Sequence, residues 1–224
     1  DQLRRGLVPP GSCRDPRRVS PAFAPAALKP WITSRLDPLS EPHTTPPSVD
    51  YGIPSARPQD LTPAAVLVGL IEREHGVTVL LTRRADTLRR HTGQIALPGG
   101  RRDPGETAWD TALREAHEEV GLHPDFVDLA GLSTPYQTGT GYLITPVVGF
   151  IRPGFSLEPN PDEVADIFET PFRFLMDPAN HEVHERETPA GDMRRFYAMT
   201  HDDRFIWGAT AGMLRILYDR LFGD

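Results

Sequence analysis

Three glutamates, Glu115, Glu118 and Glu119, stand close together in the segment GRRDPGETAWDTALREAHEEVGL, residues 100–122. Carboxylates on one helical surface repel each other, at a cost of a few tenths of a kcal/mol for each pair. One explanation is a solvated acidic face, softened by Arg114 four residues before Glu118. The other is a set of hard oxygen ligands for Mg²⁺ or Mn²⁺, ions that bridge to substrate phosphates.

A helix over residues 107–120 must position these carboxylates. Thr107 followed by Asp110 predicts a capping box, and Gly121 is suited to the C-terminal cap. Helical periodicity places an apolar face opposite the three glutamates. That predicted face consists of Trp109, Ala112, Leu113, Ala116 and Val120.

The loop before this helix favours the metal-binding interpretation. Its sequence, PGGRRDPGE, has three glycines and two prolines within nine residues, 98–106. Glycine lets the backbone approach a ligand closely and offer carbonyl or amide groups to it. A purely solvated acidic helix needs no such loop.

The segment resembles the Nudix box, a signature with Gly, five residues, Glu, seven residues, then Arg-Glu-aliphatic-any-Glu-Glu-any-Gly-aliphatic. The chain fits this pattern at Gly100, Glu106, Arg114, Glu115, Glu118, Glu119, Gly121 and Leu122. Ala116 stands at the aliphatic position and is smaller than the usual residue. So many fixed positions make the resemblance specific.

The resemblance implies the Nudix fold, an α/β/α sandwich around a mixed sheet. It implies that Glu115, Glu118 and Glu119 bind Mg²⁺ or Mn²⁺, with the carbonyl of Gly99 as a further ligand. Arg114 and Glu106 are then expected to hold the loop and the carboxylates in place. A plain salt bridge between these two residues is compatible with that role.

Hydrolysis of a phosphoanhydride is the chemistry that this set would perform. Bound cations neutralise the phosphates and activate water, and a carboxylate takes the remaining proton. The base is not always within the box in Nudix enzymes, so Glu115 and the downstream Glu163 are both candidates. Catalysis is therefore expected to depend on Glu115, Glu163 and Arg114. For Glu163, a surface position in an acidic turn is an equal alternative.

The residues before the box are similar to the additional signature of the coenzyme A pyrophosphatase subgroup. The matches are Leu80, Leu81, Thr82, Arg84, Ala85, Arg89, Gly93, Pro98, Gly99 and Gly100, whereas Leu97 replaces a phenylalanine. Arginine suits bidentate phosphate contacts. Arg84, Arg89 and Gln94 are the expected substrate contacts, although the two arginines could equally pair with acids of the domain.

This resemblance covers about residues 63–222 and implies cleavage of coenzyme A, or its oxidised or acylated forms, to 4′-phosphopantetheine and adenosine 3′,5′-bisphosphate. A Nudix pyrophosphatase acting on ADP-ribose, NADH or dinucleoside polyphosphates is the main alternative. A nucleotide sensor without turnover is disfavoured because every box carboxylate is present. RNA decapping is disfavoured by the net charge of −7.

The remaining pattern indicates an α+β domain over residues 61–224. AAVLVGLI and VTVLLTRR predict two strands joined at Gly76, and later strands are expected in LAGLSTPYQ, YLITPVVGFI and RRFYAM. EVADIFETPFRFL fits a short helix or a strand ending near Pro171. A last helix is expected from Gly208 to Phe222.

Residues 1–60 hold an outsized share of the 24 prolines and predict a partly irregular extension. Within it, residues 26–36 could form a short helix interrupted at Pro30. The role of the extension is left open by the sequence.

Bulk properties set outer limits on function. Hydrophobic residues at 38% and charged residues at 25% are ordinary for a soluble globular protein. The single cysteine, Cys13, cannot form an internal disulfide, so a cytoplasmic location is expected. The expected partner is a small nucleotide, with no nucleic acid and no membrane. The oligomeric state is open, a homodimer being one option.

Overall fold

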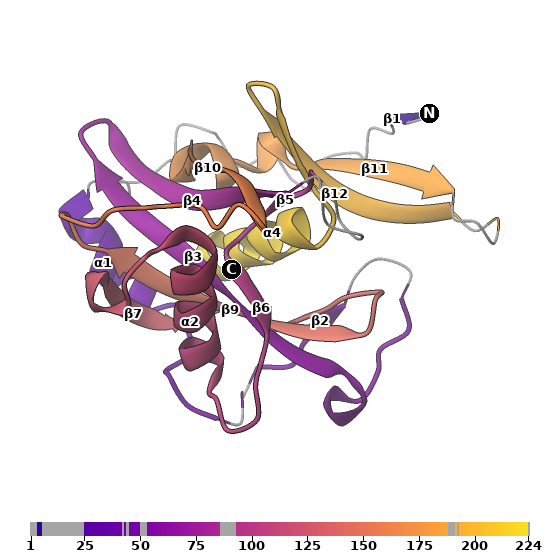
Figure 1. The fold of residues 1–224 in the computed structure, drawn as a ribbon. Coiled ribbons are helices and arrows are strands. Elements are labelled where there is room, and N and C mark those ends of the chain that lie inside the picture. Colours follow the sequence, from indigo (N-terminus) through magenta and orange to yellow (C-terminus); the bar gives the residue numbers. More distant parts are fainter. Residues whose placement is uncertain are drawn as a thin grey trace.

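The computed structural model describes residues 4–5, 25–41, 43, 45–49, 53–85, 93–187, 191 and 193–223. Its larger sheet contains β2 (Ser48–Val49), β3 (Thr62–Arg73), β4 (Gly76–Arg84), β5 (Ile95–Ala96), β6 (Gly99–Arg101), β7 (Val127–Leu132), β8 (Tyr136–Gln137), β9 (Tyr142–Ile151) and β10 (Val164–Pro171). The main strand order is β10-β4-β3-β9-β8-β2, with β5, β6 and β7 paired to β4, β3 and β9 (Figure 1).

The larger sheet is mixed. β3 runs parallel to β9 over ten residue pairs and antiparallel to β4 and β6. A second sheet has the order β1-β11-β12-β13, formed by β1 (Arg4–Arg5), β11 (Glu182–Glu187), β12 (Met193–His201) and β13 (Arg204–Trp207). Gly76 begins β4 with a φ of 121°, a backbone conformation that suits glycine at the predicted turn.

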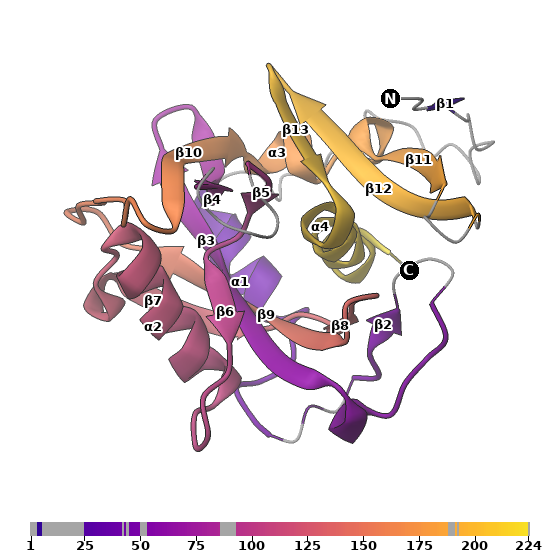
Figure 2. The ribbon, with the colours of Figure 1, turned by 45° about the vertical axis from the view of Figure 1, so that its right-hand side comes forward.

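Four described helices accompany the sheets: α1 (Pro25–Thr33), α2 (Ala108–Val120), α3 (Phe172–Leu175) and α4 (Gly208–Phe222). Short 3₁₀ turns occur at Pro58–Asp60, Pro124–Phe126 and Pro178–Asn180. Figure 2 shows α2 on one side of the larger sheet and α4 on the other. The predicted α+β class and the sandwich of helices around a mixed sheet are confirmed.

Side chains of β3 alternate between two hydrophobic cores because successive residues of a strand point to opposite faces. Ala65, Leu67 and Ile71 pack with α2, whereas Val66, Val68 and Leu70 pack with α1 and α4. This alternation explains why the strand is apolar almost throughout: both of its faces are covered by helices.

The short helix expected within residues 26–36 is present as α1, but the expected interruption at Pro30 is wrong. α1 continues through Pro30, although a proline inside a helix loses one hydrogen bond and costs about 3 kcal/mol. Leu28 and Ile32 are 1% and 0% exposed and join the core beneath α4. Burial of these two side chains offsets the cost of the proline, which itself faces solvent.

Several elements agree with the predictions made from the sequence, and others were not predicted. The last helix begins and ends at the predicted residues, and the segment before Pro171 is the strand β10 followed by α3. The short strand β2 and strands β11 and β13 were not predicted. Because α1 and β2 pack onto the rest of the fold, the division at residue 60 stays a prediction.

Candidate metal and active site

Helix α2 is fixed at both ends by local interactions. The Thr107 hydroxyl accepts a hydrogen bond from the Asp110 amide at 3.1 Å, and the Asp110 carboxylate accepts one from the Thr107 amide at 3.0 Å. Gly121 ends the helix with a φ of 70°, where its amide bonds to the His117 carbonyl at 2.9 Å. The predicted capping box and glycine cap are confirmed.

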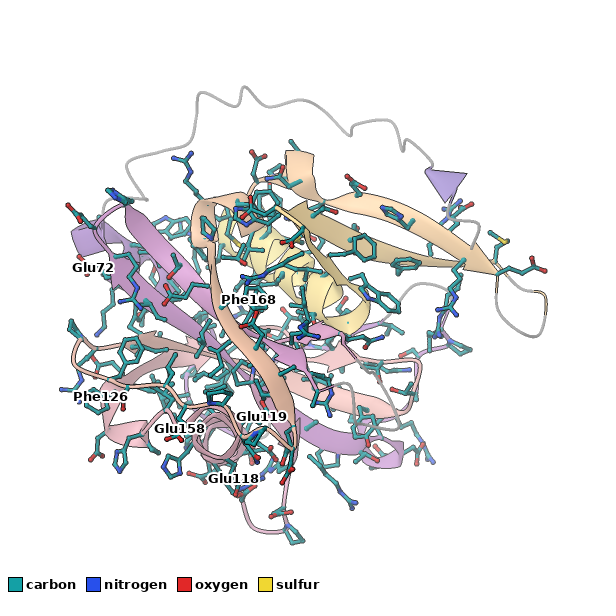
Figure 3. All side chains as sticks on the ribbon, turned by 45° about the horizontal axis from the view of Figure 1, so that its top comes forward. Glu72, Glu118, Glu119, Phe126, Glu158 and Phe168 are labelled. Atoms are coloured by element: carbon teal, nitrogen blue, oxygen red, sulfur yellow. The ribbon has the colours of Figure 1, made fainter. Side chains whose placement is uncertain are left out.

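The three glutamates differ in their exposure to solvent, although helical periodicity placed all of them opposite the apolar face. Glu119 is only 4% exposed, whereas the side chain of Glu118 is 54% exposed and that of Glu115 is 15% exposed. Glu119 follows Ala112 by seven residues and therefore lies on the same helical stripe as that buried alanine. The structure thus buries most of Glu115 and Glu119 and leaves Glu118 largely in solvent. Figure 3 shows Glu118 and Glu119 at the end of α2.

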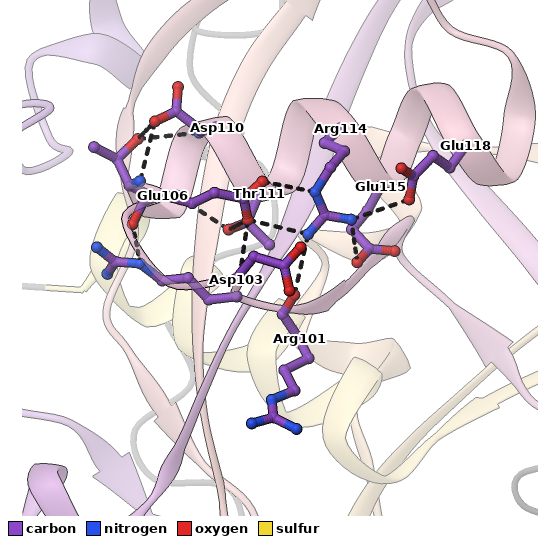
Figure 4. A network of polar contacts seen from close by, with 10 residues as sticks. Arg101, Asp103, Glu106, Asp110, Thr111, Arg114, Glu115 and Glu118 are labelled. Atoms are coloured by element: carbon purple, nitrogen blue, oxygen red, sulfur yellow. Dashed lines mark hydrogen bonds and ion pairs between the residues drawn. The ribbon is translucent and has the colours of Figure 1, made fainter.

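Arg114 is the centre of a polar network on this face of α2 (Figure 4). Its guanidinium donates to the Glu106 carboxylate at 2.7 and 3.0 Å. It also donates to Glu115 at 2.8 Å, to Glu118 at 3.0 Å and to the carbonyl of Arg101 at 3.1 Å. Arg114 therefore joins the glycine-rich loop to the helix carboxylates.

Glu106 is the main partner of Arg114 in this network. Hydrogen bonds from Arg114 lower the pKa of Glu106 to about 2, so the carboxylate is charged at neutral pH. It also accepts from the Asp103 amide at 3.0 Å and from the Thr111 hydroxyl at 2.8 Å. The sequence reasoning missed Thr111, although a threonine one turn beyond a capping residue was a usable signal.

Two consecutive glycines allow the strand β6 to approach its neighbours. A Cβ added to Gly99 would collide with the backbone of Val66 on β3. A Cβ added to Gly100 would lie 2.5 Å from the carboxylate carbon of Glu115. The amide of Gly99 donates to Glu119 at 3.2 Å. Gly99 is needed because the backbone of β3 lies directly against this strand, and Gly100 is needed because the Glu115 carboxylate does.

Burial raises the pKa of Glu119 to about 7 and also raises the pKa of Glu115. The negative charge of Glu163 adds to both increases. A divalent cation would relieve this crowding of carboxylates, and oxygen donors are what Mg²⁺ and Mn²⁺ prefer. The residues present therefore fit a metal ion, although no three metal-binding side chains are already gathered as a cage among the described residues.

Glu163 is held beside the site by backbone contacts. The preceding segment caps the end of α2, because the Glu158 amide donates to the Val120 carbonyl and the Asn160 amide to the Glu119 carbonyl, each at 2.9 Å. The Glu163 carbonyl then accepts from the Ala85 amide at 2.8 Å. These bonds place Glu163 between the end of α2 and the end of β4.

Arg84, the last residue of β4, brings a positive charge to the carboxylates. Its guanidinium lies 3.9 Å from Glu119, and its Nε is buried with no hydrogen-bond acceptor among the described residues. Gln94 lies alongside, where its carbonyl accepts from the Arg84 amide at 2.9 Å. Arg89 lies outside the described residues. Leu97 is 3% exposed and packs in the core, as expected of an apolar replacement.

The model of the NUDIX domain family matches residues 60–196. The chain therefore belongs to the Nudix family, and the prediction of an enzyme of the Nudix pyrophosphohydrolase class is confirmed. Enzymes of this family generally use divalent metal ions and bind small nucleotide substrates. Within the described part of the chain, no helix has the length and apolar character needed to cross a membrane.

Relatives of high identity carry the same family name. The chain is 39% identical over 158 residues to the uncharacterized Nudix hydrolase NudL of Yersinia pestis strain Pestoides F, covering 69% of this chain and 77% of that protein. NudL of Yersinia pseudotuberculosis strain IP 31758 matches with the same identity and coverage.

Solved structures that resemble the chain include a Caenorhabditis elegans Ap4A hydrolase binary complex, with 18% identity, a TM-score of 0.44 and coverage of 49% of this chain and 80% of that chain. Another is the Nudix hydrolase RenU of M. smegmatis, with 26% identity, a TM-score of 0.43 and coverage of 50% and 71%.

Proposed function

We propose that the protein hydrolyses the pyrophosphate bond of coenzyme A or its thioesters. The products would be adenosine 3′,5′-bisphosphate and 4′-phosphopantetheine, or its acyl form. The observation that carries this proposal is the position of Arg84, a residue of the coenzyme A-type signature, 3.9 Å from the buried Glu119 of the Nudix box. The signature and the box thus meet at one place.

Mg²⁺ or Mn²⁺ is the proposed cofactor, held by Glu115, Glu118 and Glu119 with the carbonyl of Gly99. When bound, the ion would neutralise the two phosphoryl groups and make water more acidic. Arg114 is a positioning residue here, because its hydrogen bonds orient Glu115 and Glu118. Its hydrogen-bonded ion pair with Glu106 keeps the glycine-rich loop against the helix.

Glu163 is the proposed general base. Glu115 already accepts a hydrogen bond from Arg114, which makes it less available to take a proton from water. Glu163 is also close enough to Glu115 and Glu119 to raise the pKa of both. In this assignment Glu163 takes a proton from the attacking water while the leaving phosphate departs on the opposite side of phosphorus.

Substrate phosphates are proposed to bind at Arg84, with Arg89 and Gln94 on the same segment between β4 and β6. A partly buried arginine whose Nε has no acceptor within the described part of the chain is suited to a phosphate oxygen. Coenzyme A carries a 3′-phosphate in addition to its pyrophosphate. More than one positively charged side chain would therefore help to bind it.

A product assay tests the substrate. The purified protein is incubated with Mg²⁺ or Mn²⁺ and coenzyme A, ADP-ribose, NADH or a diadenosine polyphosphate, and products are identified by mass spectrometry. We expect adenosine 3′,5′-bisphosphate and 4′-phosphopantetheine to form fastest. Faster cleavage of another compound would show that this compound, and not coenzyme A, is the preferred substrate. The proposal that the protein is a Nudix pyrophosphatase would still hold.

A further inference from the structure

Residues 37–41, 43 and 45, here called the N-terminal strap, lie outside the segment 60–196 that matches the family. Asp37 and Leu132 exchange two backbone hydrogen bonds of 3.0 and 2.9 Å, and the Asp37 carboxylate accepts from the Thr45 hydroxyl at 2.6 Å. The same carboxylate is paired with Arg220 of α4. The strap is therefore fixed to both β7 and the last helix.

Glu41 extends from this strap to the start of α2. Its two carboxylate oxygens accept from the two terminal nitrogens of Arg102 at 2.6 and 2.7 Å, a bidentate arrangement. One of them also accepts from the Ala108 amide at 3.2 Å. Glu41 thus supplies a carboxylate at the helix N-terminus from a distant part of the chain, where negative charge is favourable.

Arg102 transmits this contact to the Nudix box. Its Nε donates to the carbonyl of Glu106, and its amide donates to the carbonyl of Pro63 at 3.0 Å. Glu106 in turn holds Arg114, which holds Glu115. A continuous series of polar contacts, which passes through the backbone of Glu106, therefore connects the strap to a proposed metal ligand.

We propose that Glu41 is a positioning residue of the Nudix site, supplied by the N-terminal extension. Its task is to fix Arg102 and the first turn of α2, so that Glu106 and Arg114 hold the carboxylates in a metal-binding arrangement. The inference deepens the proposed function and depends on the metal site assigned there.

The effect should fall on the site more than on overall stability. The side chains of Arg102 and Glu41 are 29% and 32% exposed, and ion pairs of this kind contribute little to the free energy of unfolding. Loss of an outer hydrogen bond around a metal site, by contrast, lowers metal affinity or activity by about 10- to 100-fold. A purely stabilising role of Glu41 therefore predicts a change in the melting temperature, whereas a positioning role predicts a change in metal affinity and activity.

The first test is Glu41→Gln in the full chain, which keeps the shape of the side chain and removes its charge. Mn²⁺ binding without substrate is measured by calorimetry, turnover is measured as kcat and KM separately, and the melting temperature is recorded. We expect about tenfold weaker Mn²⁺ binding and about tenfold lower kcat, with KM nearly unchanged. Wild-type Mn²⁺ affinity and kcat would overturn the proposal.

Asp60→Asn is the matched control. Asp60 makes a comparable fork with Arg57, at 2.7 and 3.1 Å, in the same N-terminal part of the chain but without contact to the box. The Asp60→Asn variant should leave Mn²⁺ binding unchanged. An equal loss in both variants would also overturn the proposal, because it would reflect a general effect of charge.

Two further variants complete the design. Glu41→Gln combined with Arg102→Gln should lose no more activity than Arg102→Gln alone, since both changes break one link. Should Glu41→Gln unfold, Glu41→Asp keeps the charge and shortens the reach, and wild-type Mn²⁺ affinity in a folded Glu41→Asp protein would overturn the proposal. Glu119→Gln reports separately on the metal site: if it leaves Mn²⁺ binding intact, the proposed function fails, whatever Glu41 does.

Discussion

The amide nitrogen of Gly99 donates a hydrogen bond to the buried carboxylate of Glu119 at 3.2 Å. This contact joins strand β6 to the last turn of α2, 20 residues later in the chain. It orients one carboxylate oxygen and leaves the other facing Arg84, 3.9 Å away. The strand, the helix and the end of β4 therefore meet at a single side chain.

Glu119→Gln should lower kcat by at least about a hundredfold, because the metal site supplies several kcal/mol of charge stabilisation in the transition state. The fold should persist, since a neutral amide is easier to bury than a carboxylate. Steady-state kinetics and thermal melting measure the two effects. Glu72→Gln, at an exposed position at the end of β3, is the control that should keep full activity. A fully active and folded Glu119→Gln protein would disprove the metal-site assignment.

Glu106→Gln should make the free energy of unfolding less dependent on pH in the acidic range. Arg114 lowers the pKa of Glu106 to about 2, so the wild-type carboxylate contributes stability that is present above its ordinary pKa of 4.5 and is lost as the pH falls through about 2. The variant should be less stable at pH 7 by about 1 kcal/mol, allowing for solvent screening. Urea unfolding at pH 7 and pH 3 measures this difference, which should shrink at the lower pH. A constant difference would contradict the assigned pairing.

Gly100→Ala and Gly99→Ala should have different consequences. The added methyl at residue 100 meets the carboxylate of Glu115, a side chain that can move, so kcat should fall by about tenfold while the fold persists. At residue 99 the methyl meets the backbone of Val66, so the melting temperature should fall as well. Circular dichroism and kinetics on both proteins separate the effects. Equal melting temperatures would contradict the geometry.

Arg84→Gln should raise KM for coenzyme A by about tenfold, the equivalent of one lost charge-assisted phosphate contact. Arg83→Gln is the matched control, because neighbouring residues of a strand point to opposite faces and Arg83 is directed away from Glu119. Initial-rate measurements over a range of coenzyme A concentrations distinguish the variants. The same rise in KM for both would show only a general need for positive charge.

Pro30→Ala should stabilise the protein. The substitution restores a backbone donor inside α1 at a solvent-facing position, worth about 3 kcal/mol in a helix interior, less about 1 kcal/mol for the greater freedom of the unfolded chain. A gain of about 2 kcal/mol is expected in urea unfolding. A loss of stability would mean that the proline ring makes a favourable contact of its own.

Local signals in the sequence predicted the parts of the site that depend on neighbouring residues. The caps of α2 at Thr107 and Gly121 follow from residue types and their spacing, whereas the pairing of Arg114 with Glu106 was implied by the resemblance to the Nudix box. Helical periodicity placed Glu119 opposite the apolar face of the helix. Its burial depends on Gly99, which the fold brings to it from another element.

Contacts between distant segments could not be derived in this way. Glu41 lies 61 residues before Arg102, and nothing in the Pro-rich stretch around it indicates a partner. The continuous helix at Pro30 has a similar origin, because Leu28 and Ile32 are held by the core and not by local preference. Tertiary packing therefore decided both features.

Strand β3 lies in both hydrophobic cores, with Leu67 against α2 and Val68 against α1 and α4. Neither helical layer can lose its packing without uncovering one face of this strand. The two layers should therefore unfold together as one cooperative unit, and the amide protons of β3 should exchange with solvent only through global opening. An ion bound beside α2 would then protect α1 and α4 against unfolding as well, although neither helix touches it.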